Sequence, residues 1–283
     1  YSTNGFTHVT NSTIMGNKAE VRGGGIRVIG STVSTLSMTN VTITANEAPD
    51  GGGIFYEGAS ASLRYLTVTN NRASKTAGGI YSTQAMTLTN SIVHGNQATS
   101  NAEMRGPISG TNNLVGSSNG GNFSHGVNSN IVGYNPRLSE LGDWGGPTKT
   151  FKLLPGSPAL DAGIDIEDIT TDQRGFPRVV DAADSDTIAT PDIGAVEHYP
   201  MISDIANFSI YPGQTTSTNF YVGNPVYGNI EVSATSSNQS VVPDENITIS
   251  NINSTSHRIS FKGNSAGTTT ISVTATSNGQ SAT

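Results

Sequence analysis

The sequence contains no cysteine, so neither a disulfide framework nor a thiolate metal site can form. Charged residues make up only 12% of the 283 residues, and the helix formers Glu, Lys, Leu and Arg are sparse. Thr, Ser, Asn and Gly dominate instead, a composition that favours many short strands joined by turns. We therefore expect an all-β protein.

Basic residues are also few, because Lys and Arg number 14 against 21 Asp and Glu, which gives a net charge of −7. A phosphate-binding surface needs clustered Lys and Arg, so this charge argues against nucleic acid as a partner and favours cation binding. No apolar run approaches the roughly 18 to 20 residues that cross a bilayer, and we expect no membrane-spanning segment. No signal peptide is recognisable and the first residue is Tyr1, so we expect a processed or trimmed piece of a longer chain.

The first hundred residues contain an internal repeat. Four asparagines align at spacings of 29, 25 and 25 residues, and three glycines share their register: Asn17, Asn46, Asn71 and Asn96, with Gly25, Gly53 and Gly79. Each unit contains an alternating strand, a turn with Asn, a glycine pair and a second strand. Hairpins would need turns about every 8 to 12 residues, whereas a coil of roughly 25 residues is typical of a right-handed parallel β-helix.

The aligned residues suggest structural roles. A corner between parallel strands needs φ > 0 at one residue, which Asn tolerates, and stacked Asn amides can also hydrogen-bond from coil to coil. The glycines are expected at corners where a Cβ would meet the neighbouring coil. Apolar residues in equivalent positions are predicted to stack inside the helix: Ile14, Ile43, Val68 and Ile92. A ligand site on these rows is the alternative interpretation.

The character of the chain changes after Gln97, and residues 136–198 are rich in Pro, Gly and Asp. This segment is predicted to cap the open end of the helix, whose strand edges are otherwise unpaired. Trp144, the only tryptophan, is expected to plug that end. Short Asp side chains beside Gly and Pro usually cap turns.

A second domain is predicted after the segment HYPMISD. Evenly spaced alternating strands follow, from FSIYP to TTISVTATS, which indicates an immunoglobulin-like β-sandwich. We therefore divide the chain into a β-helix with its cap, residues 1–198, and a sandwich, residues 201–283.

Three groups of segments resemble known families. The Asn and GGGI units are similar to the repeats of bacterial β-helix surface proteins of the polymorphic outer-membrane-protein and adhesin type. The stretches LGDWGGPTKTFKLLPGSPALDAG, TDQRGFP and PDIGAVE resemble the end of the choice-of-anchor β-helix domains of secreted bacterial proteins. IEVSATSSNQSVVP and GTTTISVTATSNG are similar to tandem Ig-like or cadherin-like repeats of bacterial exoproteins. These resemblances imply an extracellular location at the cell surface and an architecture, but no defined activity.

Carboxylates are concentrated towards the end of the predicted cap, because 12 of the 21 Asp and Glu lie between Glu140 and Glu197. The spacing in DAADSD lets one loop direct several oxygens at one point, and calcium takes roughly six to eight oxygen ligands. We predict a calcium site formed by Asp181, Asp184, Asp186 and Asp192. A solvated acidic loop without a cation is the alternative.

The repeat region shows no catalytic pattern. Glycoside hydrolases need paired carboxylates, and polysaccharide lyases need a cation and a base on one sheet face. The acids of this region occupy no repeated strand position, and its arginines form no obvious cluster with them: Glu20, Glu47, Asp50 and Glu57, with Arg22, Arg27, Arg64 and Arg72. Some of the aromatic residues on consecutive coils can offer an outer face for sugar rings, and a core or packing role is the equal alternative: Phe55, Tyr56, Tyr65 and Tyr81.

The sequence therefore predicts an extracellular bacterial surface protein without enzymatic activity. Its predicted role is adhesive or structural, through binding of a glycan or a surface protein. One alternative is a self-assembling filament, in which the partners are copies of the chain itself. The other is a polysaccharide lyase or glycoside hydrolase.

Overall fold

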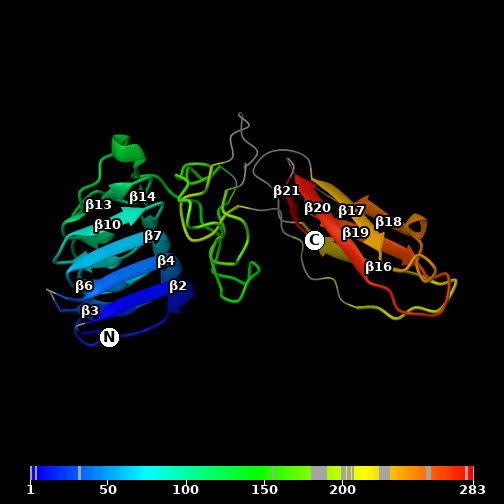
Figure 1. Cartoon of the computed structure of the whole chain (residues 1–283), viewed down its shortest axis with the longest axis horizontal. Coiled ribbons are helices and arrows are strands. Elements are labelled where there is room, and N and C mark those ends of the chain that lie inside the picture. Colours follow the sequence, from blue (N-terminus) through cyan, green and yellow to red (C-terminus); the bar gives the residue numbers. More distant parts are fainter. Residues whose placement is uncertain are drawn as a thin grey trace. The chain divides into compact units, whose positions relative to one another are not determined.

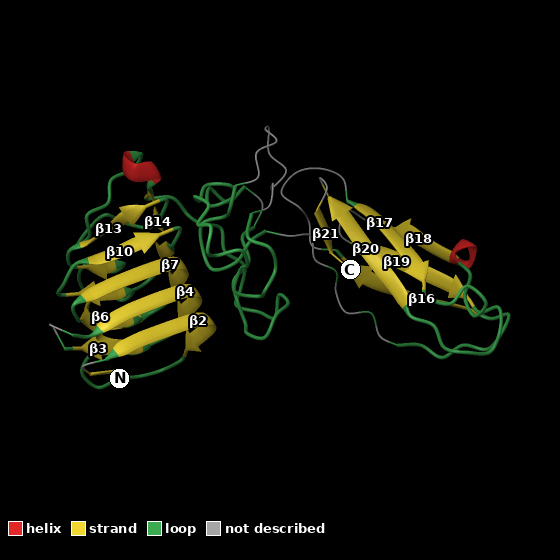
Figure 2. Ribbon diagram, in the orientation of Figure 1, coloured by secondary structure: helices red, strands yellow, loops and turns green. Residues whose placement is uncertain are grey.

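The computed structural model describes residues 2–3, 5–30, 33–154, 156–179, 190–198, 202, 205, 207–222, 230–252, 256–277 and 280–282. These residues belong to two compact units, one that ends at His198 and one formed by the chain beyond it. Strands dominate both units (Figure 2). The helices in the described ranges are two short 3-10 turns, η1 (Val127–Ser129) and η2 (Asp244–Asn246), and neither could cross a membrane.

The first unit is a parallel β-helix whose coils supply strands to three sheets (Figure 1). The first sheet contains β1 (Ser2–Thr3), β3 (Ile26–Ile29), β6 (Ile54–Glu57), β9 (Ile80–Ser82) and β12 (Met104–Arg105). The second contains β2 (Phe6–Met15), β4 (Thr35–Thr44), β7 (Ser60–Thr69), β10 (Met86–Thr89), β11 (Ile92–His94), β13 (Ile108–Thr111), β14 (Leu114–Val115) and β15 (Ile131–Val132). The third contains β5 (Glu47–Asp50) and β8 (Arg72–Thr76).

The interior of the β-helix is a stack of apolar side chains. Ile14, Ile43, Val68 and Val93 lie in register on β2, β4, β7 and β11 and pack in one core. The prediction that Ile92 belongs to this stack is wrong, because Ile92 pairs with Thr67 and therefore points to the opposite face. Val93, three residues before Asn96, occupies the equivalent position.

Three columns of positive φ mark corners of the coils. One lies within the long strands and contains Asn11, Asn40, Tyr65, Asn90 and Asn112, with φ from 46° to 55°. The second contains Gly16, Ala45, Asn70 and Gly95, and the third contains Gly23, Gly51, Ala77 and Asn101. The repeat asparagines have no positive φ. The residue directly before each of them, in the second column, has the positive φ instead. The backbone role predicted for them is therefore wrong.

The repeat asparagines instead form a ladder of side-chain amides that is buried except at Asn17. Asn17, Asn46 and Asn71 each donate their Nδ2 to the Oδ1 of the asparagine on the next coil, at 2.9 to 3.0 Å. Each backbone N–H also donates to that same oxygen. Asn96 donates its Nδ2 to the carboxylate of Glu103, at 2.8 Å, so the ladder ends on an acid that the sequence did not reveal.

Close contact between coils explains the aligned glycines. A Cβ on Gly53 would lie 2.7 Å from the carbonyl oxygen of Gly79. We expect Gly53→Ala to lower the free energy of unfolding by about 2 kcal/mol or more, because backbone would have to move. Urea unfolding followed by the fluorescence of Trp144, the only tryptophan, measures this loss.

Gly16→Ala is the matched control. Gly16 has φ +67°, a Cβ added to it would meet nothing within 4 Å, and Ala45 already occupies the equivalent corner on the next coil. The loss at this position should be about 1 kcal/mol or less. Equal losses in the two variants would contradict the steric explanation.

The described part of residues 136–198, here called the cap segment, lies along the side of the β-helix (Figure 1). Corner asparagines of two different coils hold the segment by hydrogen bonds from Nδ2 to its carbonyl oxygens. Asn40 donates to Thr171 at 2.7 Å, and Asn90 donates to Ile164 at 2.7 Å. The predicted position across the open end is therefore wrong.

The outward column of the second sheet gives the reason for this position. It begins with Thr13, Thr42 and Thr67 and continues with Ile92 and Leu114. These last two side chains would be exposed on a bare β-helix, but they pack with apolar residues of the cap segment: Leu153, Ala159 and Ile193. The hydrophobic effect thus places the segment on this face.

Other residues close the interior. Phe123, in the connection between β14 and β15, belongs to the interior core together with Met104 and Val115. Trp144 does not take the predicted role of a plug. It is half-buried within the cap segment, where the Nζ of Lys152 lies 4.0 Å from its ring centroid.

The second unit contains two three-stranded antiparallel sheets. One has the order β16 (Thr215–Tyr221), β19 (Ser256–Lys262) and β18 (Ile247–Asn251), and the other has β17 (Glu231–Ser236), β20 (Ile271–Ser277) and β21 (Gln280–Ala282). Phe220, Ile259, Val273 and Ala275 from both sheets share one core, as in a β-sandwich. The FSIYP segment lies outside the strands, although it was predicted as one. The predicted fold class, a parallel β-helix followed by a β-sandwich, is confirmed.

Candidate functional site

Most of the predicted calcium ligands lie outside the described residues. This is the case for Asp181, Asp184 and Asp186. Asp192 is described and is buried, with its two oxygens accepting the backbone N–H groups of Asp161 and His198 at 2.9 and 2.6 Å. Both oxygens of this carboxylate are therefore used in hydrogen bonds within the cap segment. Among the described residues, no group of three or more His, Asp and Glu is arranged to hold a metal, so calcium binding by the DAADSD loop stays a prediction.

A buried ionic cluster joins the cap segment to the β-helix. Arg174 binds Asp172 through Nε and Nη2, at 2.8 and 2.7 Å. Arg178 is fully buried and donates to Asn40 Oδ1 at 2.6 Å and to the carbonyl oxygens of Gly194 and Ala195 at 3.1 Å. Its guanidinium also lies 4.0 Å from the ring centroid of Tyr65.

The environment of this cluster shifts three pKa values. Burial raises the pKa of Asp192 to about 7. Burial and the nearby charge of Asp192 raise the pKa of Glu197 well above its usual value, although Arg178 lies 3.6 Å away. Burial lowers the pKa of His198 to about 4. These groups hold the segment in place, and nothing in their arrangement opens them to a ligand.

The shifts predict a pH-dependent stability. A carboxyl with a raised pKa in the folded state stabilises the fold at low pH and loses that contribution as the pH rises towards the folded pKa. The lowered pKa of His198 acts in the opposite direction, but only between about pH 4 and 6.5. We therefore expect the free energy of unfolding, followed by Trp144 fluorescence, to fall as the pH rises from about 4 to about 7, most steeply above pH 6.5, where His198 no longer opposes the fall. Asp192→Asn should reduce this fall, whereas Asp143→Asn, at an exposed position, should leave it unchanged.

The strongest candidate for a binding surface lies on the outward face of the first sheet. Arg27, Phe55, Tyr81 and Arg105 occupy one register column across β3, β6, β9 and β12, and Arg22 precedes β3 beside them. We call these five residues the arginine stripe. Their neighbours in each strand point inwards, as shown by Val28, Tyr56, Ile80 and Met104 in the interior core.

Contacts between rings and guanidinium groups order this stripe. Phe55 and Tyr81 pack edge to face, with ring centroids 5.2 Å apart and planes at 85°. The guanidinium carbon of Arg22 lies 4.8 Å from the ring centroid of Phe55, and that of Arg105 lies 5.4 Å from that of Tyr81. Both distances are within the range of cation–π attraction. Asp50 is the acid nearest to Arg22, at 3.8 Å.

Exposure makes the stripe accessible to a partner. The side chain of Arg22 is 42% exposed, Arg105 is exposed and Tyr81 is half-buried, whereas Phe55 is fully buried beneath them. The stripe therefore presents the guanidinium groups of Arg22 and Arg105 on the surface, each packed against an aromatic ring. Guanidinium groups bind carboxylate, sulfate and phosphate groups through pairs of parallel hydrogen bonds.

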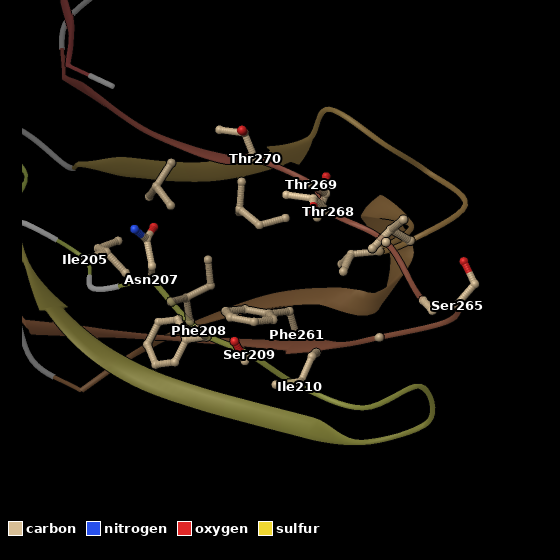
Figure 3. Close-up of a pocket in the computed structure, with 18 residues that line it drawn as sticks. Ile205, Asn207, Phe208, Ser209, Ile210, Phe261, Ser265, Thr268, Thr269 and Thr270 are labelled. Atoms are coloured by element: carbon tan, nitrogen blue, oxygen red, sulfur yellow. The ribbon is translucent and has the colours of Figure 1, made fainter.

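The second unit contains a cavity of about 600 Å³ between its two sheets (Figure 3). Phe208, Ile210, Ile259, Phe261 and other core-facing residues line it, and Phe208 packs edge to face against Phe261. Ligand pockets usually combine apolar walls with a few converging polar groups. Because no charged residue is among the residues that line this cavity, we interpret it as loosely packed core.

Comparisons of the chain with protein-family models, curated proteins and solved structures find no match. No family is therefore assigned. The arginine stripe, and the resemblances in the sequence, are the basis for a functional proposal.

The sequence contained a signal for most of the stripe. Arg27, Phe55 and Tyr81 each stand two residues after an aligned glycine, and strand alternation places that position on the same face in every coil. The prediction for the arginines rested on their position relative to the acids of the repeat region, and not relative to the aromatic residues. Arg105 was not recognisable because Glu103 replaces the expected glycine in its coil, as the pairing of Met104 with Ile80 shows.

Proposed function

We propose that this chain is an adhesive or structural module of an extracellular bacterial surface, and that it binds a glycan or a surface protein through the arginine stripe. The ordered arrangement of Arg22, Phe55, Tyr81 and Arg105 on an outward sheet face carries this proposal. The long β-helix supplies a rigid support, because each coil is fixed to the next by backbone pairing and by the asparagine ladder.

The resemblance to choice-of-anchor and Ig-like bacterial proteins supports the extracellular setting. In that setting the sandwich acts as a stalk, and the β-helix carries the binding face. Calcium binding by the DAADSD loop is a separate part of the proposal and does not involve the stripe.

Adhesion of coated beads tests this function. Beads carrying the full chain are washed over surfaces coated with a panel of extracellular glycans and surface proteins, in buffer with a chelator and without one. We expect retention on at least one surface, and a loss of most of it in the Arg22→Ala/Arg105→Ala double variant. Retention by the double variant equal to that of the unchanged chain, on every surface, would contradict the proposal.

The control variant removes the same charge elsewhere. Arg64 lies on β7 in the second sheet, and Arg258 lies exposed on β19 of the second unit. Beads with Arg64→Ala/Arg258→Ala carry the same net charge as those with the stripe variant. Their retention should equal that of the unchanged chain.

A further inference from the structure

Arg27 and Arg105 lie on one face of the first sheet and Arg22 lies beside it, although the chain as a whole carries a net charge of −7. Arg27 and Arg105 end a register column in which Phe55 and Tyr81 lie between them. Neighbouring strands are about 4.8 Å apart, so the two arginine backbones are separated by roughly 14 Å along the axis of the β-helix. The guanidinium groups of Arg27 and Arg105 therefore mark the two ends of a line, with two aromatic residues between them.

From this arrangement we infer that the arginine stripe binds a linear acidic polysaccharide, with its sugar carboxylates or sulfates on Arg22 and Arg105 and a sugar ring against Tyr81. The inference rests on the proposed function and names the class of its ligand. Acidic polysaccharides repeat an anionic group along a chain, and their rings carry apolar C–H faces that stack on aromatic side chains. A stripe that holds cationic groups beside a partly exposed aromatic ring matches both features.

The cation–π contacts also reduce the cost of binding. An exposed arginine on a flexible surface loses rotamer freedom when it binds an anion. Phe55 and Tyr81 already restrict the guanidinium groups of Arg22 and Arg105. The pairing of Arg22 with Asp50, at 3.8 Å, is too long for a hydrogen bond, so an anionic ligand can compete for this guanidinium.

A nucleic acid also carries regularly spaced anions, but surfaces that bind it usually gather many Lys and Arg, and the stripe contains three arginines. Acidic proteins would bind through individual side chains and would not need a linear array. We therefore favour the polysaccharide, and the experiment tests it directly.

Binding of defined polymers to the immobilised full chain tests the inference. The probes are polygalacturonate as a carboxylated polymer, chondroitin sulfate as a sulfated polymer and dextran as a neutral polymer. All measurements contain a calcium chelator, so that cations cannot bridge polymer and protein. We expect at least one acidic polymer to bind, dextran not to bind, and the affinity to weaken as salt is added.

Matched variants locate the binding. Arg22→Ala and Arg105→Ala should each weaken binding by about tenfold, because each removes a charge-assisted pair of hydrogen bonds. Arg105→Lys, which retains the charge but lacks the planar fork, should also weaken it. Arg64→Ala, with the same loss of charge on another sheet, should not. Because Arg22 and Arg105 are exposed, the variants should retain the unfolding midpoint of the unchanged chain.

The outcomes separate the inference from the proposed function. Equal binding of acidic polymers by the stripe variants and the unchanged chain would overturn the inference, because the polymers would bind elsewhere. Failure of both acidic polymers to bind, while bead adhesion still depends on Arg22 and Arg105, would overturn the inference and leave the proposed function standing. Bead adhesion that does not depend on the stripe would overturn both.

Discussion

Asn71→Ala should lower the free energy of unfolding of the first unit by about 3–5 kcal/mol. Asn71 is fully buried at the centre of the ladder, where its Nδ2 donates to the carbonyl oxygens of Ile43 and Thr69 and to Asn96 Oδ1. Its Oδ1 accepts two N–H groups of Asn46. The substitution leaves several of these buried groups without a partner, and each costs about 1–3 kcal/mol.

Urea unfolding monitored by Trp144 fluorescence measures this loss, because the only tryptophan lies in the first unit. Asn17→Ala is the matched control, since Asn17 is exposed and lies at the first coil of the same ladder. Water can replace its lost hydrogen bonds, so the loss should stay below about 1 kcal/mol. A loss at Asn71 no larger than that at Asn17 would show that the ladder contributes little to stability.

Arg178→Met should release the cap segment from the β-helix. The substitution keeps much of the side-chain volume but removes the three hydrogen bonds to Asn40, Gly194 and Ala195. Glu197 then remains buried without its nearest cation. Breaking a buried ion pair by removing one partner typically costs about 3–5 kcal/mol.

Hydrogen exchange detects this release by region. We expect faster exchange in residues 156–179 and 190–198, and also in β11 and β14, whose outward side chains Ile92 and Leu114 the segment covers. Arg72→Met, the same change at an exposed position of β8, should leave exchange unaltered. Unchanged protection of the cap segment in Arg178→Met would mean that apolar contacts alone hold it.

The repeat made the fold predictable. A period of about 25 residues, with Asn and Gly in register, indicated coils of parallel strands, and the ladder and the close glycine contacts follow from the same alignment. The register of one apolar residue was misjudged because SIVH contains two adjacent apolar side chains, and only the distance to Asn96 distinguishes Ile92 from Val93.

The position of the cap segment could not be predicted, because it depends on contacts between distant residues. Thr42 and Gln173, for example, are joined by a side-chain hydrogen bond of 2.7 Å, and nothing in either local sequence indicates the other. A second amide pair, Asn113 with Asn130, also escaped the alignment because the coil between them is shorter. The stripe was only partly recognised, since Arg22 and Arg105 stand outside the repeat pattern.

The asparagine ladder gives the β-helix a direction. In every bond between two amides the donor lies on the earlier coil and the acceptor on the following one. A coil duplicated between Asn17 and Asn96 would therefore have a donor on one side and an acceptor on the other. Glu103 ends this series, because its carboxylate accepts from Gly95 and Asn96 and, when ionised, has no proton to pass on. Glu103 is therefore the last acceptor of this ladder, and repeats added within the ladder would have to be inserted before it.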